Sequence, residues 1–123
     1  SEVWGLCLGL IRVHDGYVCG APYWIEPTGE GVTLGALALG ESDITDVDSD
    51  VSAEHARIWR SDHDGWLVKD LGSSNGTLVV DGANRAENKM QGGAAVPLHA
   101  GDELRQGAST VFAVVEGTPE RWT

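Results

Sequence analysis

Positive charge is scarce in this 123-residue chain: 8 Lys and Arg stand against 19 Asp and Glu, which gives a formal net charge of −11. Between Arg12 and Arg57 there is no Lys or Arg at all. Such a chain would be repelled by nucleic acid and by anionic membrane surfaces. The charge therefore argues against both as partners and favours a protein or peptide that carries basic side chains.

Long apolar runs and cysteines are also few. No apolar run approaches the length that spans a bilayer, and the first residues lack the basic start and apolar core of a signal peptide. The two cysteines, Cys7 and Cys19, are too few for a disulfide framework. One bridge between them stays open, but unpaired thiols in a reducing cytoplasm are favoured. Because the chain starts with Ser1, we expect it to be a piece of a longer cytoplasmic protein.

Helical periodicity is missing, and strand patterns recur in its place. No stretch keeps apolar residues at three- and four-residue spacing for the length of a helix. Short apolar or alternating segments are separated instead by Gly, Asn and Asp clusters, in a chain with 17 Gly. These segments fall at residues 3–13, 55–60, 66–69, 77–80 and 110–115. The pattern predicts one all-β domain, a sandwich or a barrel, in which residues 82–96 form an exposed loop.

Three loops carry polar residues that are suited to binding. The first, residues 35–54, is rich in acid, and the second is its end, Val51–His55, at the entry to a strand. The third, Asp70–Thr77, contains Asn75-Gly76, a favoured tight-turn pair because both positions accept positive φ. Ser and Asn side chains there would present hydroxyl and amide donors on a rigid support.

Sequence motifs in these loops have a specific match. The segments DVSAEHARI, WLVKDLGSSNGTLVV and VPLHAGDELRQGASTVFAVV together resemble the forkhead-associated (FHA) family over roughly residues 23–116. Ser52 and His55 form its Ser-x-x-His motif. Asn75 and Gly76 begin its Asn-Gly-Thr motif, preceded by the hydroxyl residue Ser74.

The resemblance implies an FHA-type β-sandwich of two antiparallel or mixed sheets, about eleven strands in all, which binds phosphothreonine peptides with loops at one end. It implies that Ser52 and Ser74 donate to the phosphate, that Asn75 holds the peptide backbone, and that His55 and Gly76 shape the loops. The family-like domain would cover residues 23–116. Residues 1–22 would be an N-terminal strand or extension packed on the sandwich, and residues 117–123 a C-terminal tail. The resemblance implies no catalysis and no cofactor.

One family residue is missing, the Arg that follows a Gly upstream of Ser-x-x-His and holds the phosphate. The candidate pairs here are Gly35-Ala36 and Gly40-Glu41, and neither contains Arg. A charge-assisted hydrogen bond contributes about 1.5–3 kcal/mol, so phosphate binding should be roughly ten- to a hundred-fold weaker. We therefore expect weak or absent phosphothreonine binding, and a site that accepts a basic or unphosphorylated segment. Arg57 is the one substitute that the sequence leaves open.

Three other classes of function deserve comparison. The first is a phosphate-independent docking domain of a larger signalling protein, which the charge distribution favours. The second is a hydrolase, since Gly72–Gly76 fits the nucleophile elbow Gly-x-Ser-x-Gly around Ser74, with Asp81 or Asp102 and His99 as partners. That elbow needs a following helix, however, and the residues that follow read as a strand.

The third is a calcium site, because Asp46, Asp48 and Asp50 occupy the first, third and fifth positions of a calcium-loop pattern. Val51 and Arg57 then break its essential sixth and twelfth positions. The acidic run is therefore expected to be a solvated loop. The four histidines show no ligand spacing either, so no metal is predicted.

Overall fold

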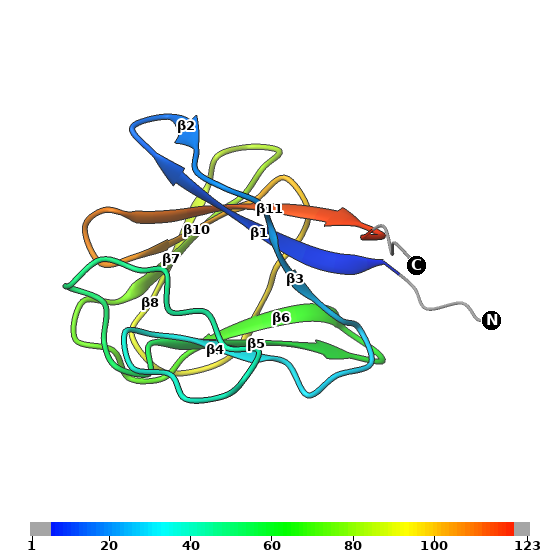
Figure 1. Cartoon of the computed structure of the whole chain (residues 1–123), viewed down its shortest axis with the longest axis horizontal. Helices are drawn as coiled ribbons and strands as arrows, with labels where there is room; N and C mark the ends of the chain where they lie inside the picture. The colour runs from blue at the N-terminus through cyan, green and yellow to red at the C-terminus, as the bar shows by residue number, and fades with distance from the viewer. Residues whose placement is uncertain (1–5, 120–123) are drawn as a thin grey trace.

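A computed structural model of the chain describes residues 6–119, and these residues form eleven β-strands and no helix (Figure 1). The predicted all-β sandwich is thereby confirmed. The outer parts of the predicted N-terminal extension and C-terminal tail, residues 1–5 and 120–123, lie outside the described residues. The strands are β1 (Cys7–His14), β2 (Tyr17–Val18), β3 (Tyr23–Ile25), β4 (Val32–Leu34), β5 (Ala56–Ser61), β6 (Gly65–Asp70), β7 (Thr77–Val80), β8 (Glu87–Met90), β9 (Val96–Pro97), β10 (Glu103–Gln106) and β11 (Thr110–Gly117).

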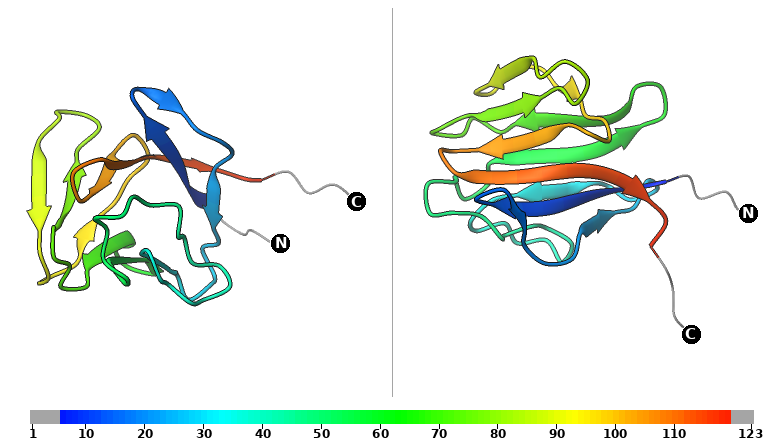
Figure 2. Two further views of the ribbon diagram at one scale, coloured as in Figure 1. Left: turned by 60° about the vertical axis from the view of Figure 1, so that its left-hand side comes forward. Right: turned by 90° about the horizontal axis from the view of Figure 1, so that it is seen from above.

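The strands form two sheets that face each other (Figures 1 and 2). The large sheet has the order β2-β1-β11-β10-β7-β8, with β3 also paired to β1, and the small sheet has the order β4-β5-β6-β9. The paired strands of residues 6–119 are all antiparallel, and one isolated parallel bridge joins Leu34 to Ile44. β1 pairs with β11 from Cys7↔Gly117 to Val13↔Val111, so residues outside the family resemblance supply an inner strand of the large sheet.

The core lies between the sheets and is built from alternate residues of their strands. Ile58 and Val68 of the small sheet and Leu104 and Phe112 of the large one are fully buried. Each such side chain contributes about 1.5–3 kcal/mol on burial. Several polar side chains are buried beside this apolar centre: His55, Asp70, Ser73, Thr77, Gln106 and Thr110.

Those buried polar residues lie where three connections leave the sandwich. Leu34 of β4, Ala56 of β5 and Asp70 of β6 form one row of the small sheet. In the large sheet, Gln106 of β10 pairs with both Thr77 of β7 and Thr110 of β11. The loop end of the molecule is formed by the segments that follow or precede these rows, which are residues 35–55, 71–76 and 107–109.

One stretch departs from the prediction for residues 82–96. This stretch was expected to be an exposed loop, but Glu87–Met90 pairs with β7 as strand β8, and Val96–Pro97 forms β9. The sequence did not predict β8 because its residues are mostly polar. Polar residues are expected there, since β8 is an edge strand and three of its four residues are exposed.

Candidate functional site

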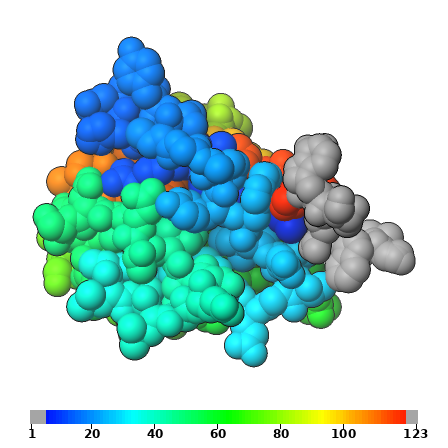
Figure 3. All heavy atoms as spheres, viewed as in Figure 1, coloured from blue at the N-terminus to red at the C-terminus, as the bar shows by residue number. Residues whose placement is uncertain are grey.

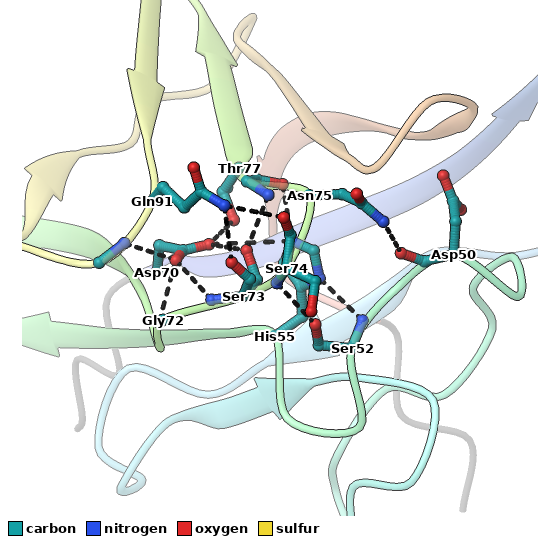
Figure 4. Close-up of polar contacts among 12 residues, drawn as sticks. Asp50, Ser52, His55, Asp70, Gly72, Ser73, Ser74, Asn75, Thr77 and Gln91 are labelled. Carbon is teal, nitrogen blue, oxygen red and sulfur yellow. Dashed lines mark hydrogen bonds and ion pairs between the residues drawn. The ribbon is translucent and has the colours of Figure 1, made fainter.

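The loop end brings together the three residues predicted to contact a ligand. The backbone N–H of Ser74 donates to the side-chain oxygen of Ser52 across 3.1 Å, and Asn75 Nδ2 donates to the carbonyl oxygen of Asp50 across 2.8 Å (Figure 4). Ser74 and Asn75 are exposed, and Ser52 is half-buried. The loop from the small sheet and the loop between β6 and β7 are therefore joined directly at the residues that the motifs single out.

His55 lies beneath this junction and is fully buried. Its Nδ1 accepts the backbone N–H of Ser52 at 3.0 Å, and its Nε2 lies 2.7 Å from the carbonyl oxygen of Gly76. Since Nδ1 must accept, the ring is neutral and Nε2–H donates to Gly76. Gly76 has φ +83°, a conformation that side chains disfavour. The two residues predicted to shape the loops are thus in direct contact.

A buried carboxylate, Asp70, organises the loop between β6 and β7. Its oxygens accept hydrogen bonds from the hydroxyls of Ser73 and Thr77, both at 2.6 Å, and from the backbone N–H groups of Gly72, Ser73 and Gly92. Burial would raise the pKa of Asp70, but these hydrogen bonds, led by those from Ser73 and Thr77, hold it below the ordinary value. The charged carboxylate therefore fixes the backbone that carries Ser74 and Asn75.

Sequence reasoning missed both Asp70 and Gln91 as parts of this site. Gln91 Nε2 donates to the carbonyl oxygens of Ser73 and Ser74, at 3.0 and 2.8 Å. A local signal for Asp70 was available, because Asp followed by Ser three positions later is a common turn-capping pattern. Gln91 had no such signal, since it directly follows β8, a strand that the sequence did not reveal.

The acidic run is a loop whose carboxylates are exposed or half-buried, as predicted, but several of them are also bonded into the fold. Asp50 Oδ2 accepts the N–H of Ala108 at 2.7 Å, and Asp48 accepts from the Ser109 hydroxyl at 2.5 Å. The Arg12 guanidinium, buried under this loop, donates to Asp48 at 2.9 Å and to the carbonyl oxygen of Asp46 at 3.0 Å. The hydrogen bond from Ser109, with help from Arg12, lowers the pKa of Asp48. These contacts tie the acidic loop to the turn between β10 and β11.

The structure distinguishes the two Gly-led pairs that were candidates for the missing Arg position. Ala36 N–H donates to the carbonyl oxygen of Ser52 at 3.0 Å, which places the Gly35-Ala36 pair beside the site. A Cβ on Gly35 would lie 2.2 Å from the carbonyl oxygen of Ala53, so the close approach of these backbones requires glycine there. The Gly35-Ala36 pair therefore lies beside the backbone of Ser52.

Arg57 is directed away from this position. Its guanidinium donates to Thr33 Oγ1 at 3.1 Å and to the carbonyl oxygen of Glu30 at 2.6 Å. Glu30 precedes β4, whereas the loop end follows it. Among residues 6–119, no Lys or Arg side chain makes a hydrogen bond or ion pair with Ser52, Ser74 or Asn75.

Two cations do occur on the side of the loop end that belongs to the large sheet. A pocket of about 350 Å³ next to Asn75 is lined by Lys89, Gln91 and Arg105, among others. Arg105 is already paired with Glu103, at 2.7 Å. Lys89 and Arg105 belong to β8 and β10, whereas Ala36 continues the small sheet, so neither replaces an Arg beside Ser52.

The other classes of site find no matching geometry in the described part of the chain. Ser74 lies before Thr77 of β7, while Asp102 and His99 lie at the other end of β10, whose Gln106 pairs with Thr77. A strand, β7, follows the would-be elbow. Within residues 6–119 no group of three or more His, Cys, Asp or Glu side chains could hold a metal ion. In the same range, no helix is long and apolar enough to cross a membrane.

A two-sheet sandwich whose loops meet at one end in a rigid polar surface is a scaffold for binding through loops. The family model of the FHA domain matches residues 32–107, more than half of the chain, and the chain belongs to this family. An FHA domain-containing protein of Arabidopsis thaliana is 35% identical over 86 residues, which are 70% of this chain and 20% of that protein. This chain thus spans about a fifth of the length of that relative.

Solved structures agree with this assignment. The FHA domain of an Arabidopsis thaliana hypothetical protein has a TM-score of 0.73 and 25% identity, and the alignment covers 100% of this chain and 96% of that one. A structure from an analysis of phosphothreonine-dependent FHA domain interactions has a TM-score of 0.60 and 27% identity, with 89% of this chain and 95% of that one covered.

Proposed function

We propose that this domain binds a segment of a partner protein at its loop end, through Ser52, Ser74 and Asn75, and that a phosphate on that segment adds little affinity. The observation that carries the proposal is the junction of the two loops, in which exposed hydroxyl and amide groups stand on a buried support of His55 and Asp70. Similarity to a structure studied for phosphothreonine-dependent interactions supports a peptide as the ligand.

Each of the three side chains keeps hydrogen-bonding capacity for a ligand. Ser52 Oγ accepts from Ser74 N–H, which leaves its own hydroxyl hydrogen to donate. The Ser74 hydroxyl makes no hydrogen bond with residues 6–119. Asn75 uses one amide hydrogen on Asp50 and retains its second hydrogen and its oxygen. Such groups can hold a peptide backbone or a side chain in one orientation.

Phosphate should contribute little because all these donors are neutral. A neutral hydrogen bond contributes about 0.5–1.5 kcal/mol, whereas a bond from a cation to phosphate contributes about 1.5–3 kcal/mol. Ala36 offers no side-chain donor beside Ser52, and the Asp50 carboxylate stands on the same loop end. A phosphothreonine would therefore meet hydroxyl and amide groups rather than a guanidinium.

A second candidate function is phosphate-independent docking inside a larger signalling protein. It is favoured by the hydrogen bonds that Ser52 and Asn75 already make between the loops, which a purely structural role would also explain. Under this reading Ser52→Ala and Asn75→Ala lower stability but leave partner binding intact, and phosphatase treatment of the partner has no effect.

We further propose that the domain is not an enzyme and that it works in the cytoplasm. The separation of Ser74 from His99 and Asp102 supports the first point, and the exposed thiol of Cys19 suits a reducing compartment. If Ser74→Ala abolished hydrolysis of a generic ester by the purified chain, the first point would be wrong.

The direct experiment is titration with matched phosphothreonine and threonine peptide libraries, followed by fluorescence anisotropy. We expect no member to bind with a sub-micromolar Kd that depends on phosphate. A sub-micromolar, phosphate-dependent complex would overturn the proposal of weak phosphate binding. Loss of all peptide binding in the Ser52→Ala, Ser74→Ala, Asn75→Ala triple variant would support the proposed site, and unchanged binding would contradict it.

A further inference from the structure

The loop end also exposes leucines, and two of them closely follow Ala36 in the chain. Leu37 is 69% exposed, Leu39 is 92% exposed and Leu71 is 40% exposed. These three, which we call the apolar ridge, are among seven large apolar residues exposed in the described part of the chain. Isolated exposed leucines are common, but a group of them at one end of a protein indicates an interaction surface.

The ridge follows the backbone that carries the proposed site. Leu37 N–H donates to the carbonyl oxygen of Ala53 at 3.0 Å, one residue after the Ala36–Ser52 bond. Leu71 N–H donates to the carbonyl oxygen of His55 at 2.9 Å. The segment that contains Ser52 and His55 thus lies between the backbones of Leu37 and Leu71, so two exposed leucines flank the residues that follow Ser52.

The leucines at 37 and 39 are held outward by the loop that carries them. Asp43 accepts the N–H of Gly40 at 2.7 Å through one oxygen and the N–H of Thr33 at 2.9 Å through the other. The carboxylate therefore fastens both arms of the loop to each other at its base. Since these hydrogen bonds fix the conformation of the loop, Leu39 is already exposed before a ligand binds. It therefore offers a preformed apolar contact.

Acidic side chains border the ridge. Glu41 and Glu54 are exposed, and neither makes an ion pair with residues 6–119 that the structure records. The nearest Arg along the chain, Arg57, is directed toward Glu30. The surface beside Ser52 is thus apolar with an anionic rim, which complements apolar side chains next to Lys or Arg.

We propose that the apolar ridge is the specificity surface of this domain and that its occupant is an unphosphorylated partner segment with apolar residues next to Lys or Arg. The inference rests on the proposed function, because it assumes that the loop end binds a partner segment. It assigns to Leu37 and Leu39 the anchoring that a guanidinium–phosphate contact would otherwise supply. The acidic rim then selects basic neighbours in the ligand.

A displayed library of random unphosphorylated peptides, selected on the 123-residue chain, tests this inference. We expect recovered peptides to be enriched in Leu, Ile or Phe next to Lys or Arg, and their affinity, measured by fluorescence anisotropy, to fall with added salt. No enrichment over the bare support, or enrichment of acidic sequences, would overturn the inference.

Paired variants separate the ridge from the rest of the loop end. Leu37→Ser with Leu39→Ser should weaken the selected peptides at least about tenfold, and Glu41→Gln with Glu54→Gln should reduce the salt dependence. The matched control is Tyr17→Ser with Val18→Ser, which removes two apolar residues exposed by 76% and 65% on the β1–β2 hairpin. In the face shown in Figure 3 this hairpin stands at the top, above the cyan-to-green loop of residues 35–54. The control pair should bind as the wild type does.

The outcomes distinguish this inference from the proposed function. If the triple variant of Ser52, Ser74 and Asn75 loses peptide binding while the Leu37→Ser, Leu39→Ser variant keeps it, the inference about the ridge is wrong and the proposed site is supported. If only the leucine pair matters, the ridge stands and the three polar residues are structural. The wild type could also sediment as a dimer, and the Leu37→Ser, Leu39→Ser variant as a monomer. That result would show that the ridge binds a second copy of the chain and would overturn the proposal of a partner segment.

Discussion

The imidazole of His55 bridges Ser52 and Gly76: Nδ1 accepts the N–H of Ser52 at 3.0 Å, and Nε2 lies 2.7 Å from the carbonyl oxygen of Gly76. One fully buried ring thereby connects the two loops that carry the proposed contact residues. This relationship explains the Ser-x-x-His spacing physically. The histidine lies three residues after the serine because the chain turns back so that its ring can receive the serine's own N–H.

His55→Ala should destabilise the domain strongly. The substitution opens a cavity and leaves Ser52 N–H and Gly76 C=O without their partner, and together these effects cost about 2–4 kcal/mol. Urea unfolding monitored by tryptophan fluorescence measures the loss. The control is His63→Ala, an exposed position that should change the free energy of unfolding by less than about 0.5 kcal/mol. A loss below about 1 kcal/mol for His55→Ala would mean that the ring does not bridge the loops.

Asp70→Asn should remove a contribution to stability that depends on pH. The folded pKa of Asp70 lies below its unfolded value, because hydrogen bonds to Ser73 and Thr77 outweigh the effect of burial. Such a group stabilises the fold above its unfolded pKa of about 3.9, and the contribution disappears as pH falls through the folded pKa. We expect wild type and variant to differ by about 1–3 kcal/mol at pH 7 and to converge below about pH 4.

Urea unfolding of both proteins from pH 7 to pH 3 measures this convergence. Asp64→Asn is the control, since the Asp64 side chain is exposed and makes no hydrogen bond with residues 6–119. A difference between wild type and Asp70→Asn that stayed constant with pH would show that the carboxylate's charge is not what stabilises the loop.

The strands that could be predicted from the sequence are those with apolar residues on the side that packs in the core. The alternation at residues 55–60 and the apolar run at 110–115 correspond to β5 and β11, and the motif spacing located the two joined loops. The two-residue strands β2 and β9 could not be found this way, because so short a segment has no periodicity. The polar edge strand β8 had the composition of a loop.

Contacts between distant residues explain what the sequence left open at the site. Gln91 supports Ser74 from 17 residues away, and Asp48 bonds Ser109 across 61 residues. No local pattern encodes such pairs. Alternation correctly separated Arg57 from buried Ile58, but it does not reveal in which direction along the strand a long side chain extends. Only the contact with Glu30 shows that Arg57 is directed away from the loop end.

Ala36→Arg should raise affinity for phosphothreonine peptides. The Ala36 backbone is bonded to that of Ser52, so a guanidinium at this position starts beside the proposed donors. One added charge-assisted hydrogen bond corresponds to a gain of about ten- to a hundred-fold in Kd. Anisotropy titrations with phosphothreonine and threonine forms of the same peptides measure it.

Glu41→Arg is the matched control for that variant, because it adds an arginine to the same loop at a residue whose backbone, within residues 6–119, is not hydrogen-bonded to Ser52. It should improve phosphopeptide binding only slightly, through general charge that added salt screens. Equal gains from both variants would show that position 36 has no special relation to the phosphate.

Arg12→Met should weaken the attachment of the acidic loop to the sandwich. Arg12 is 7% exposed, and it donates to Asp48 at 2.9 Å and to Asp46. Its loss leaves the Asp48 carboxylate, whose side chain is 36% exposed, and the Asp46 carbonyl without the buried guanidinium, which should cost about 1–2 kcal/mol, since solvent compensates part of the lost pairing. Asp48→Asn should cost less once Arg12 is gone, so a double-mutant cycle should give a coupling of about 1 kcal/mol or more.

Arg85→Met provides the comparison for Arg12→Met. Arg85 pairs with Glu103 at 3.1 Å, but its side chain is 58% exposed, and such surface pairs contribute at most about 1 kcal/mol. Urea unfolding of the three single variants and the double variant measures all these terms. If Arg12→Met proved no more costly than Arg85→Met, the acidic loop would be held mainly by its other contacts, such as those with Ser109, Thr110 and Asn75. Peptide binding would then be insensitive to Arg12, whereas a loop held by the guanidinium should lose affinity together with stability.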